Sequence, residues 1–117
     1  MFRSETCVSE PYCIIQPASP EDVAQALEVI TTHQAKFAVR SGGHSPNPGW
    51  SSISGNGILI DMSVLSEVSV SDDASVVSVG PGAYWGDVSA ATAPSGVTAI
   101  GARAPYVGVG GLLLGGK

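Results

Sequence analysis

The sequence predicts an α+β fold in which a strand–helix–strand unit is followed by a mixed β-sheet with a short helix. Apolar runs at 13–16 and 36–40 flank a stretch whose apolar residues have helical spacing. Further short β-rich runs follow residue 57, and fifteen glycines and eight prolines punctuate the chain. The length of 117 residues suits one domain or part of one.

Composition and charge exclude several classes of protein. Apolar residues make up 44% and charged residues 13% of the chain, which favours a buried core over disorder. A net charge of -5 with five basic residues disfavours nucleic acid and anionic membranes as partners. No apolar run approaches the roughly 20 residues that span a bilayer, and MFRSETCVSEPY has no apolar signal region. The compartment stays open.

The first elements are predicted in chain order. CIIQ at 13–16 is a strand, and Ser19, Pro20 and Asp22 mark a helix start through a cap, a first-turn proline and a capping-box pattern. The helix covers 20–33, and KFAVR at 36–40 is the second strand. A helical crossover links the two strands, so we expect them to be parallel neighbours.

The later elements are shorter. GILIDM at 57–62 is a third strand, while 67–71 and 75–80 form a hairpin about the turn 72–74. A short helix lies within 81–92 and is ended by Pro94, although Gly86 weakens it by about 1 kcal/mol. Residues 41–57 form a loop rich in Gly, Ser, Pro and Asn, and a loop of that length in a compact domain is usually functional.

The stretch RSGGHS at 40–45 follows the second strand directly. Two glycines there permit positive φ and a close approach to a ligand, and successive backbone N–H groups form an anion-binding nest. Arg40, Ser41 and Ser45 add donors suited to a pyrophosphate. A tight turn with a surface histidine is an equal alternative on these six residues alone.

A second glycine-rich stretch, GVGGLLLGG, covers 108–116. It does not match GxGxxG, because position 113 is Leu, and it does not match the Walker pattern at Lys117. Taken alone, a buried Gly/Leu turn without ligand is the better interpretation.

The remaining candidate residues give no chemistry of their own. Cys7 and Cys13 are free or locally bridged, and their spacing is not a metal signature. His33 lies near the end of the first helix, where it interacts with the helix dipole.

The order of the motifs resembles a known family. The stretches QPASPEDVAQAL, FAVRSGGHS, ILIDMS, VSVGPGAYWGDV and PYVGVGGLLLGG are similar to the FAD-binding domain of the vanillyl-alcohol oxidase / p-cresol methylhydroxylase (PCMH-type) family. Within it, they resemble the berberine-bridge-enzyme-like oxidoreductases. The fold class this implies is the N-terminal part of a PCMH-type FAD-binding domain.

The resemblance implies a cofactor site. The cofactor is FAD, bonded covalently through His44, with Arg40, Ser41, Gly42, Gly43 and Ser45 around its pyrophosphate and with Val107, Gly108, Gly110 and Gly111 against the flavin and phosphates. Ala104 stands where many relatives have a second flavin-linked cysteine, so a single link through His44 is expected. Trp85 is expected to pack in the core.

The resemblance also implies activity and domains. Relatives are oxidases that pass a substrate hydride to flavin and then to oxygen, with a small-molecule substrate bound by a separate domain. We expect residues 1–12 to be an N-terminal extension and 13–117 a partial FAD-binding domain, truncated, without the substrate domain and without turnover by itself. The alternatives are a binding module that holds FAD without turnover, or an inactive fragment. The flavoprotein interpretation requires the chain to fold back so that the FAD diphosphate lies between the 40–45 loop and the terminal Gly/Leu stretch.

Overall fold

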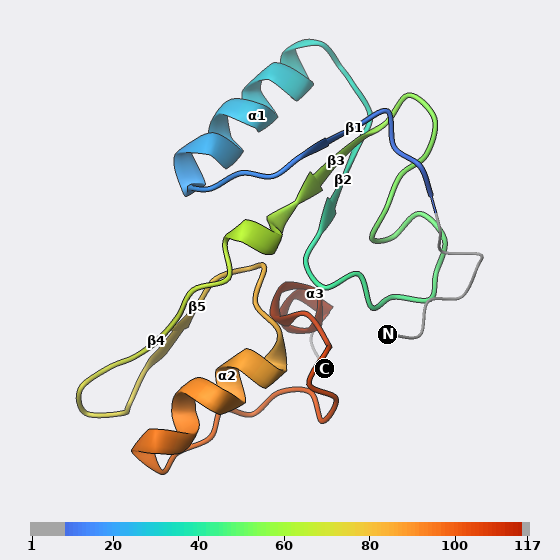
Figure 1. Ribbon diagram of the computed structural model, residues 1–117. Helices are drawn as coiled ribbons and strands as arrows, with labels where there is room; N and C mark the ends of the chain where they lie inside the picture. Colours follow the sequence, from blue (N-terminus) through green and yellow to red (C-terminus); the bar gives the residue numbers. More distant parts are fainter. Residues whose placement is uncertain (1–8, 116–117) are drawn as a thin grey trace.

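The computed structural model describes residues 9–115 and confirms the α+β class. Figure 1 shows the first half of the chain, with one helix beside three strands, above a second half in which a hairpin and two helices gather. The strands and helices follow in the order β1 (Cys13–Ile15), α1 (Pro20–Thr32), β2 (Phe37–Arg40), β3 (Ile58–Asp61), β4 (Val68–Val70), β5 (Val77–Val79), α2 (Trp85–Thr92) and α3 (Val109–Gly115). Single 3₁₀ turns, Met62–Val64 and Ala93–Ser95, follow β3 and α2.

The first three strands form a parallel sheet in the order β1-β3-β2. The prediction that the first two strands are neighbours was therefore wrong, because β3 lies between them. The reason is the composition of β3: Leu59 and Ile60 are each 1% exposed, as suits a central strand covered on both faces. Ile14 in β1 and Val39 in β2 are about half exposed, as suits edge strands.

Helix α1 begins and ends where its sequence signals predict. The Ser19 hydroxyl accepts a hydrogen bond from the Asp22 N–H at 3.1 Å, and Pro20 occupies the first turn. The Asp22 carboxylate accepts from the N–H of Ala18 at 3.0 Å, one residue before the cap, so the predicted capping box is shifted. His33 ends the helix, where its ring Nδ1–H donates to the Val29 carbonyl at 2.9 Å.

The predicted hairpin is confirmed as the antiparallel pair β4–β5. These strands form a sheet of their own, so the strands after α1 do not share one mixed sheet. In the turn, the Asp73 carboxylate accepts from the Ser71 hydroxyl at 2.7 Å and from the Ser75 hydroxyl and N–H. These hydrogen bonds, led by that from Ser71, lower the pKa of Asp73 to about 2.

A buried cluster in the second half contains Ala83, Trp85, Val88 and Val109. Trp85 is 5% exposed, which confirms its predicted place in the core. Gly86 in α2 also has a packing reason, since a Cβ there would lie 3.0 Å from the Cβ of Pro105. Helix α2 ends at Thr92, two residues before Pro94, as predicted.

Helix α3 was not predicted, and its sequence VGGLLLG explains why. Each glycine costs a helix interior about 1 kcal/mol relative to alanine. Long-range contacts fix its start instead: Val109 is buried, and its N–H donates to the Ala83 carbonyl at 3.0 Å. Tertiary packing therefore overrides a poor local propensity.

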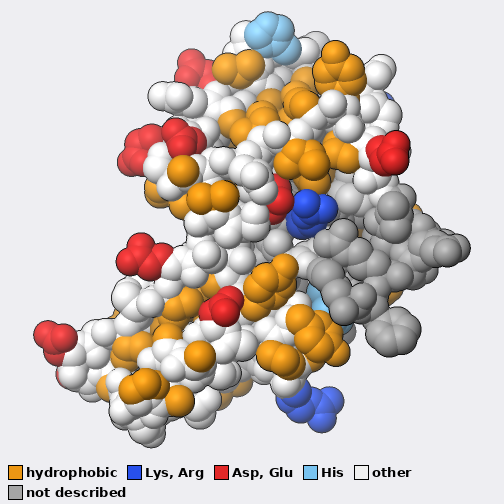
Figure 2. Space-filling view, in the orientation of Figure 1, with side chains coloured by type: hydrophobic (Ala, Val, Ile, Leu, Met, Phe, Trp, Pro, Cys, Tyr) orange, Lys and Arg blue, Asp and Glu red, His pale blue; other side chains and the backbone are white. Residues whose placement is uncertain are grey.

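The surface is consistent with the acidic composition. Figure 2 shows carboxylate side chains spread along one side of the molecule, with a notch between its upper and lower halves. Over residues 9–115, none of the helices combines the length and apolarity that a membrane crossing requires. Cys13 is exposed and free in β1, whereas Cys7 lies outside the described residues.

Candidate functional site

The site begins at the carboxyl edge of the parallel sheet, where the ends of parallel strands meet. Arg40 ends β2 and Asp61 ends β3, and the Arg40 guanidinium lies 3.2 Å from the Asp61 carboxylate. Burial acts to raise the pKa of Asp61, but hydrogen bonds from Gln16, the Ser63 N–H and Arg40, with the Arg40 charge, outweigh it and lower the pKa. Arg40 is thus anchored by a carboxylate as the chain enters the glycine loop.

Ser41 joins three segments that are distant in the sequence. Its hydroxyl donates to the Pro81 carbonyl at 2.5 Å and accepts from the Gly110 N–H at 3.3 Å. The single hydroxyl proton of Ser41 is therefore engaged within the protein, which makes this side chain a link between loops.

Two glycines place the loop backbone against the second glycine-rich stretch. A Cβ on Gly42 would lie 2.5 Å from the Gly108 nitrogen and 2.6 Å from its Cα, and a Cβ on Gly108 would collide with the Gly42 nitrogen. The Tyr84 ring lies on another side of Gly42, since the same Cβ would be 3.0 Å from the Cε1 atom of Tyr84. Only glycine permits this contact between two backbones, so the two glycine-rich stretches lie side by side.

The next residues turn outward to the surface. Gly43 has φ +64°, a left-handed conformation that favours glycine, and His44 is exposed. The Ser45 hydroxyl accepts from the Asn47 N–H at 3.3 Å. Among residues 9–115, no acceptor is recorded for the backbone N–H groups of Gly43, His44 and Ser45. Successive N–H groups of this kind suit an anion.

An aromatic ring just before the second stretch contacts the histidine. The rings of His44 and Tyr106 are stacked, with centroids 5.7 Å apart and planes at 25°. Beside them is a cavity of about 320 Å³ lined by Tyr84, Gly86, Asp87, Pro105 and Tyr106. Tyr106 therefore contacts His44 on the one hand and lines this hollow on the other.

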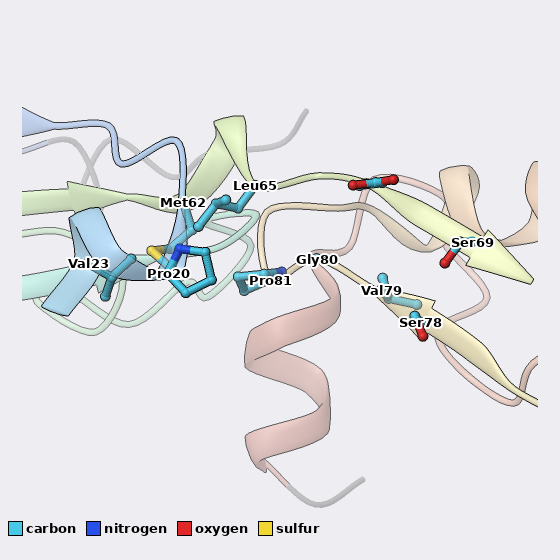
Figure 3. Close-up of a pocket in the computed structure, with 10 residues that line it drawn as sticks. Pro20, Val23, Met62, Leu65, Ser69, Ser78, Val79, Gly80 and Pro81 are labelled. Atoms are coloured by element: carbon cyan, nitrogen blue, oxygen red, sulfur yellow. The ribbon is translucent and has the colours of Figure 1, made fainter.

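Two other hollows lie away from these residues. Figure 3 shows one of about 570 Å³ between the start of α1, the segment 62–67 and the β4–β5 hairpin. A second, of about 840 Å³, lies between residues 34–38 and the loop 48–57. None of the three hollows, including the one that Tyr106 lines, is lined by a residue of the predicted cofactor site.

The predicted residues differ in their surroundings in the structure. Gly42, Gly108 and Gly110 are packed between the loops, while His44 and Gly111 are exposed. Val107 is half-buried, and its carbonyl accepts from the Trp85 N–H at 3.0 Å. Arg40 and Ser41 are engaged by other protein groups.

Three residues of this arrangement were missed by sequence reasoning. Asp61 could have been found, because residues ending neighbouring parallel strands meet at one edge. Tyr84 and Tyr106 lie within recognised motifs, but no local pattern pairs them with Gly42 and His44. In the described part of the chain, no three His, Cys, Asp or Glu side chains gather as a metal site would need.

Comparison with known proteins identifies the class of protein. Residues 11–117 match the model of a family described as FAD binding domain. The chain belongs to this FAD-binding domain family.

Curated relatives with similar sequences are fungal flavoproteins. The chain is 44% identical over 112 residues to the FAD-dependent monooxygenase macF of Penicillium terrestre, covering 96% of this chain and 22% of that protein. It is 41% identical over 113 residues to the FAD-dependent monooxygenase yanF of Aspergillus niger, covering 97% and 20%. The chain thus spans about a fifth of the length of these relatives.

Solved structures confirm the PCMH-type resemblance. The glucooligosaccharide oxidase of Acremonium strictum superposes with a TM-score of 0.82 at 26% identity, over 94% of this chain and 23% of that one. 6-Hydroxy-D-nicotine oxidase of Arthrobacter nicotinovorans gives 0.79 at 29% identity, over 86% and 22%. The Acremonium enzyme is described as carrying a 6-S-cysteinyl, 8α-N1-histidyl FAD.

Proposed function

We propose that this chain is the part of a flavin-dependent oxidoreductase that holds FAD, with residues 13–117 belonging to the FAD-binding domain and residues 1–12 preceding it. The substrate is a small molecule bound by a separate domain. FAD, when bound, accepts a hydride from substrate and passes two electrons to oxygen. One observation carries the proposal: the backbones of Gly42 and Gly108 touch, and the chain then turns outward at Gly43 to expose His44.

The residues fit a cofactor that carries a diphosphate. The N–H groups of Gly43, His44 and Ser45 follow one another without a recorded acceptor among the described residues, which suits phosphate oxygens. Gly108, Gly110 and Gly111, with Val107, would hold the flavin and phosphates from the opposing stretch. Arg40 contributes its positive charge at the entrance of the loop, and Ser41 contributes by fixing the loop's position.

His44 is proposed to form one covalent bond to the cofactor. With FAD bound, one imidazole nitrogen of His44 would hold the methyl carbon at the flavin's dimethylbenzene edge in place of one methyl hydrogen. The two protons released from that C–H and from the imidazole N–H, with two electrons, would reduce oxygen to hydrogen peroxide. The neutral imidazole supplies the lone pair. Ala104 cannot add the cysteinyl link described for the Acremonium oxidase, so we propose a single attachment.

The covalent bond is tested by measuring flavin absorbance that stays with the protein after denaturation. The purified chain is incubated with FAD, precipitated with acid and washed, and flavin absorbance in the pellet is measured. We expect wild type and His33→Ala to retain flavin equally and His44→Ala to retain none. His33 is the matched control because it is also an exposed histidine, bonded only to its own helix. Flavin in the wash for all three proteins would show reversible binding only, and absence of binding would refute the proposal.

A turnover assay separates the kinds of chemistry. Several relatives are named monooxygenases and several solved structures are named oxidases. An oxidase releases hydrogen peroxide for each substrate oxidised, whereas a monooxygenase incorporates an oxygen atom. We propose the oxidase reaction for the flavoprotein that includes the substrate domain, and no turnover by this chain alone; a peroxide assay with sugars, alcohols and amines tests both. A chain that retains flavin without oxidising any substrate would be a binding module.

A further inference from the structure

Tyr106 contacts the His44 imidazole through the face of its ring. The centroid distance of 5.7 Å and the interplanar angle of 25° are those of an offset stack. In the part of the chain that the structure describes, the stack is the one interaction recorded for the His44 ring, with no hydrogen bond or ion pair. Both imidazole nitrogens are therefore left without a partner among residues 9–115.

The residues on either side of Tyr106 are fixed to the rest of the fold. The Pro105 carbonyl accepts from the Gly86 N–H at 2.9 Å, and the Val107 carbonyl accepts from the Trp85 N–H at 3.0 Å. Both donors belong to the first turn of α2, and Trp85 is anchored in the buried cluster. Tyr106 is thus held between two attached residues, whereas His44 lies on an exposed loop.

We propose that Tyr106 is a positioning residue, which holds the His44 imidazole by its face and leaves its nitrogens free to bond FAD. This inference rests on the proposed covalent link. A hydrogen bond to a protein group would also orient the ring, but it would occupy one of the two ring nitrogens. If that protein group were an acceptor, it would also fix the N–H proton on the nitrogen that it contacts. A stack orients the ring without using the lone pair that attacks the flavin methyl carbon.

The test compares Tyr106→Leu, which removes the aromatic face, with Tyr106→Phe, which keeps it. Tyr12→Leu is the matched control, because Tyr12 is an 80% exposed tyrosine outside the site. Each protein is incubated with FAD, and two quantities are followed in time: FAD that stays bound through gel filtration, and FAD that stays in the acid-washed pellet. We expect Tyr106→Leu to slow covalent attachment about three- to tenfold, as an orientation effect of one stack allows, with total FAD binding unchanged. Tyr106→Phe and Tyr12→Leu should match wild type.

Proton NMR gives a readout that does not require FAD. The Tyr106 ring current should shift the His44 ring protons upfield, and cross-relaxation should connect the two rings. The shift should persist in Tyr106→Phe and disappear in Tyr106→Leu. Wild-type spectra without contact between the two rings would overturn the inference even if a variant failed to fold.

The outcomes distinguish the inference from the function on which it rests. A wild-type chain that retains no flavin overturns the covalent link and the positioning role together. Covalent attachment in wild type at the same rate as in Tyr106→Leu overturns the positioning role alone. Slow attachment in Tyr106→Phe would assign the effect to the hydroxyl group and would also overturn it.

Discussion

In the glycine loop RSGGHS, the inner half, residues 40–42, and the outer half, residues 43–45, differ in the contacts that hold them in place. The inner half is bound by an ion pair to Asp61, by the hydrogen bonds that the Ser41 hydroxyl donates to the Pro81 carbonyl and accepts from the Gly110 N–H, and by backbone contact with Gly108. The outer half has one stacked ring and one hydrogen bond within the loop. The difference separates two tasks: the inner half fixes the position of the backbone, and the outer half presents N–H groups and an imidazole to a ligand.

The largest expected effect comes from adding a methyl group to the inner half. Gly42→Ala would place a Cβ 2.5 Å from the Gly108 backbone nitrogen, and neither backbone can yield without breaking the Ser41 links. We expect a loss of about 3 kcal/mol or more in the free energy of unfolding, the upper range of overpacking, measured by urea denaturation.

Gly115→Ala is the matched control for that experiment. A Cβ at Gly115 meets no atom within 4 Å, so we expect this variant to be as stable as wild type or up to about 1 kcal/mol more stable. Equal stability of Gly42→Ala and Gly115→Ala would show that the two loops do not touch in solution.

The second effect concerns the charge that anchors Arg40. Asp61→Asn keeps the shape of the side chain but removes the negative charge opposite the guanidinium, and we expect a loss of about 2 kcal/mol near neutral pH. The pKa of Asp61 is lower in the folded protein. The stabilisation that the Asp61 carboxylate contributes to the fold is therefore complete above its pKa in the unfolded chain, about 3.9. It is lost as the pH falls through the lower pKa of Asp61 in the folded protein.

The measurement is a pair of urea curves at several pH values. The difference between wild type and Asp61→Asn should be constant above about pH 5 and should shrink below about pH 4. Glu28→Gln, on the exposed surface of α1, serves as the control for a lost carboxylate. A stability difference between the two proteins that does not change with pH would mean that the loss comes from the shape of the side chain. The ion pair would then not be what holds the inner half.

The two halves also differ in how far the sequence predicts them. Local signals were sufficient for helix α1, where Ser19 and Pro20 mark the first turn, and for the hairpin, where short β-branched runs flank 72–74. The glycines at 42 and 43 predicted a positive φ, which is found at Gly43, and a close approach to a ligand, which stays a prediction; the approach that the structure shows is between Gly42 and Gly108. These features follow from the conformational limits of single residues.

Features that depend on distant partners were not predictable in this way. The position of β3 between β1 and β2 depends on which strand is most buried, and the pattern within β1 and β2 does not contain that information. Helix α3 forms against glycine propensity because Val109 is buried beside Ala83 and Trp85. The Tyr106–His44 stack joins residues with no shared local pattern, so only the folded arrangement shows it.

A smaller effect is expected from the link between the loops. Ser41→Ala leaves the Pro81 carbonyl without its donor and the Gly110 N–H without its acceptor, and we expect a loss of about 1 kcal/mol. The matched control is Ser78→Ala, an exposed serine of β5 for which no side-chain hydrogen bond is recorded within residues 9–115. FAD retention by Ser41→Ala should fall because the loop is less ordered without these hydrogen bonds, whereas Ser78→Ala should retain FAD as wild type does. Unchanged retention and stability in Ser41→Ala would mean that Gly42 alone positions the inner half.

The smallest effect on stability is expected in the outer half. Ser45→Ala removes only a 3.3 Å hydrogen bond from the Asn47 N–H at the surface, so the free energy of unfolding should change by less than about 0.5 kcal/mol. If Ser45 contacts the cofactor's phosphate, the same variant should still bind FAD several-fold more weakly, which an equilibrium titration of flavin fluorescence measures. If the variant binds FAD as tightly as wild type does, only the backbone N–H groups and His44 of the outer half would remain as contacts with FAD. A variant that unfolds more easily by 2 kcal/mol or more, far above the roughly 0.5 kcal/mol expected at a surface position, would show that the outer half is also structural.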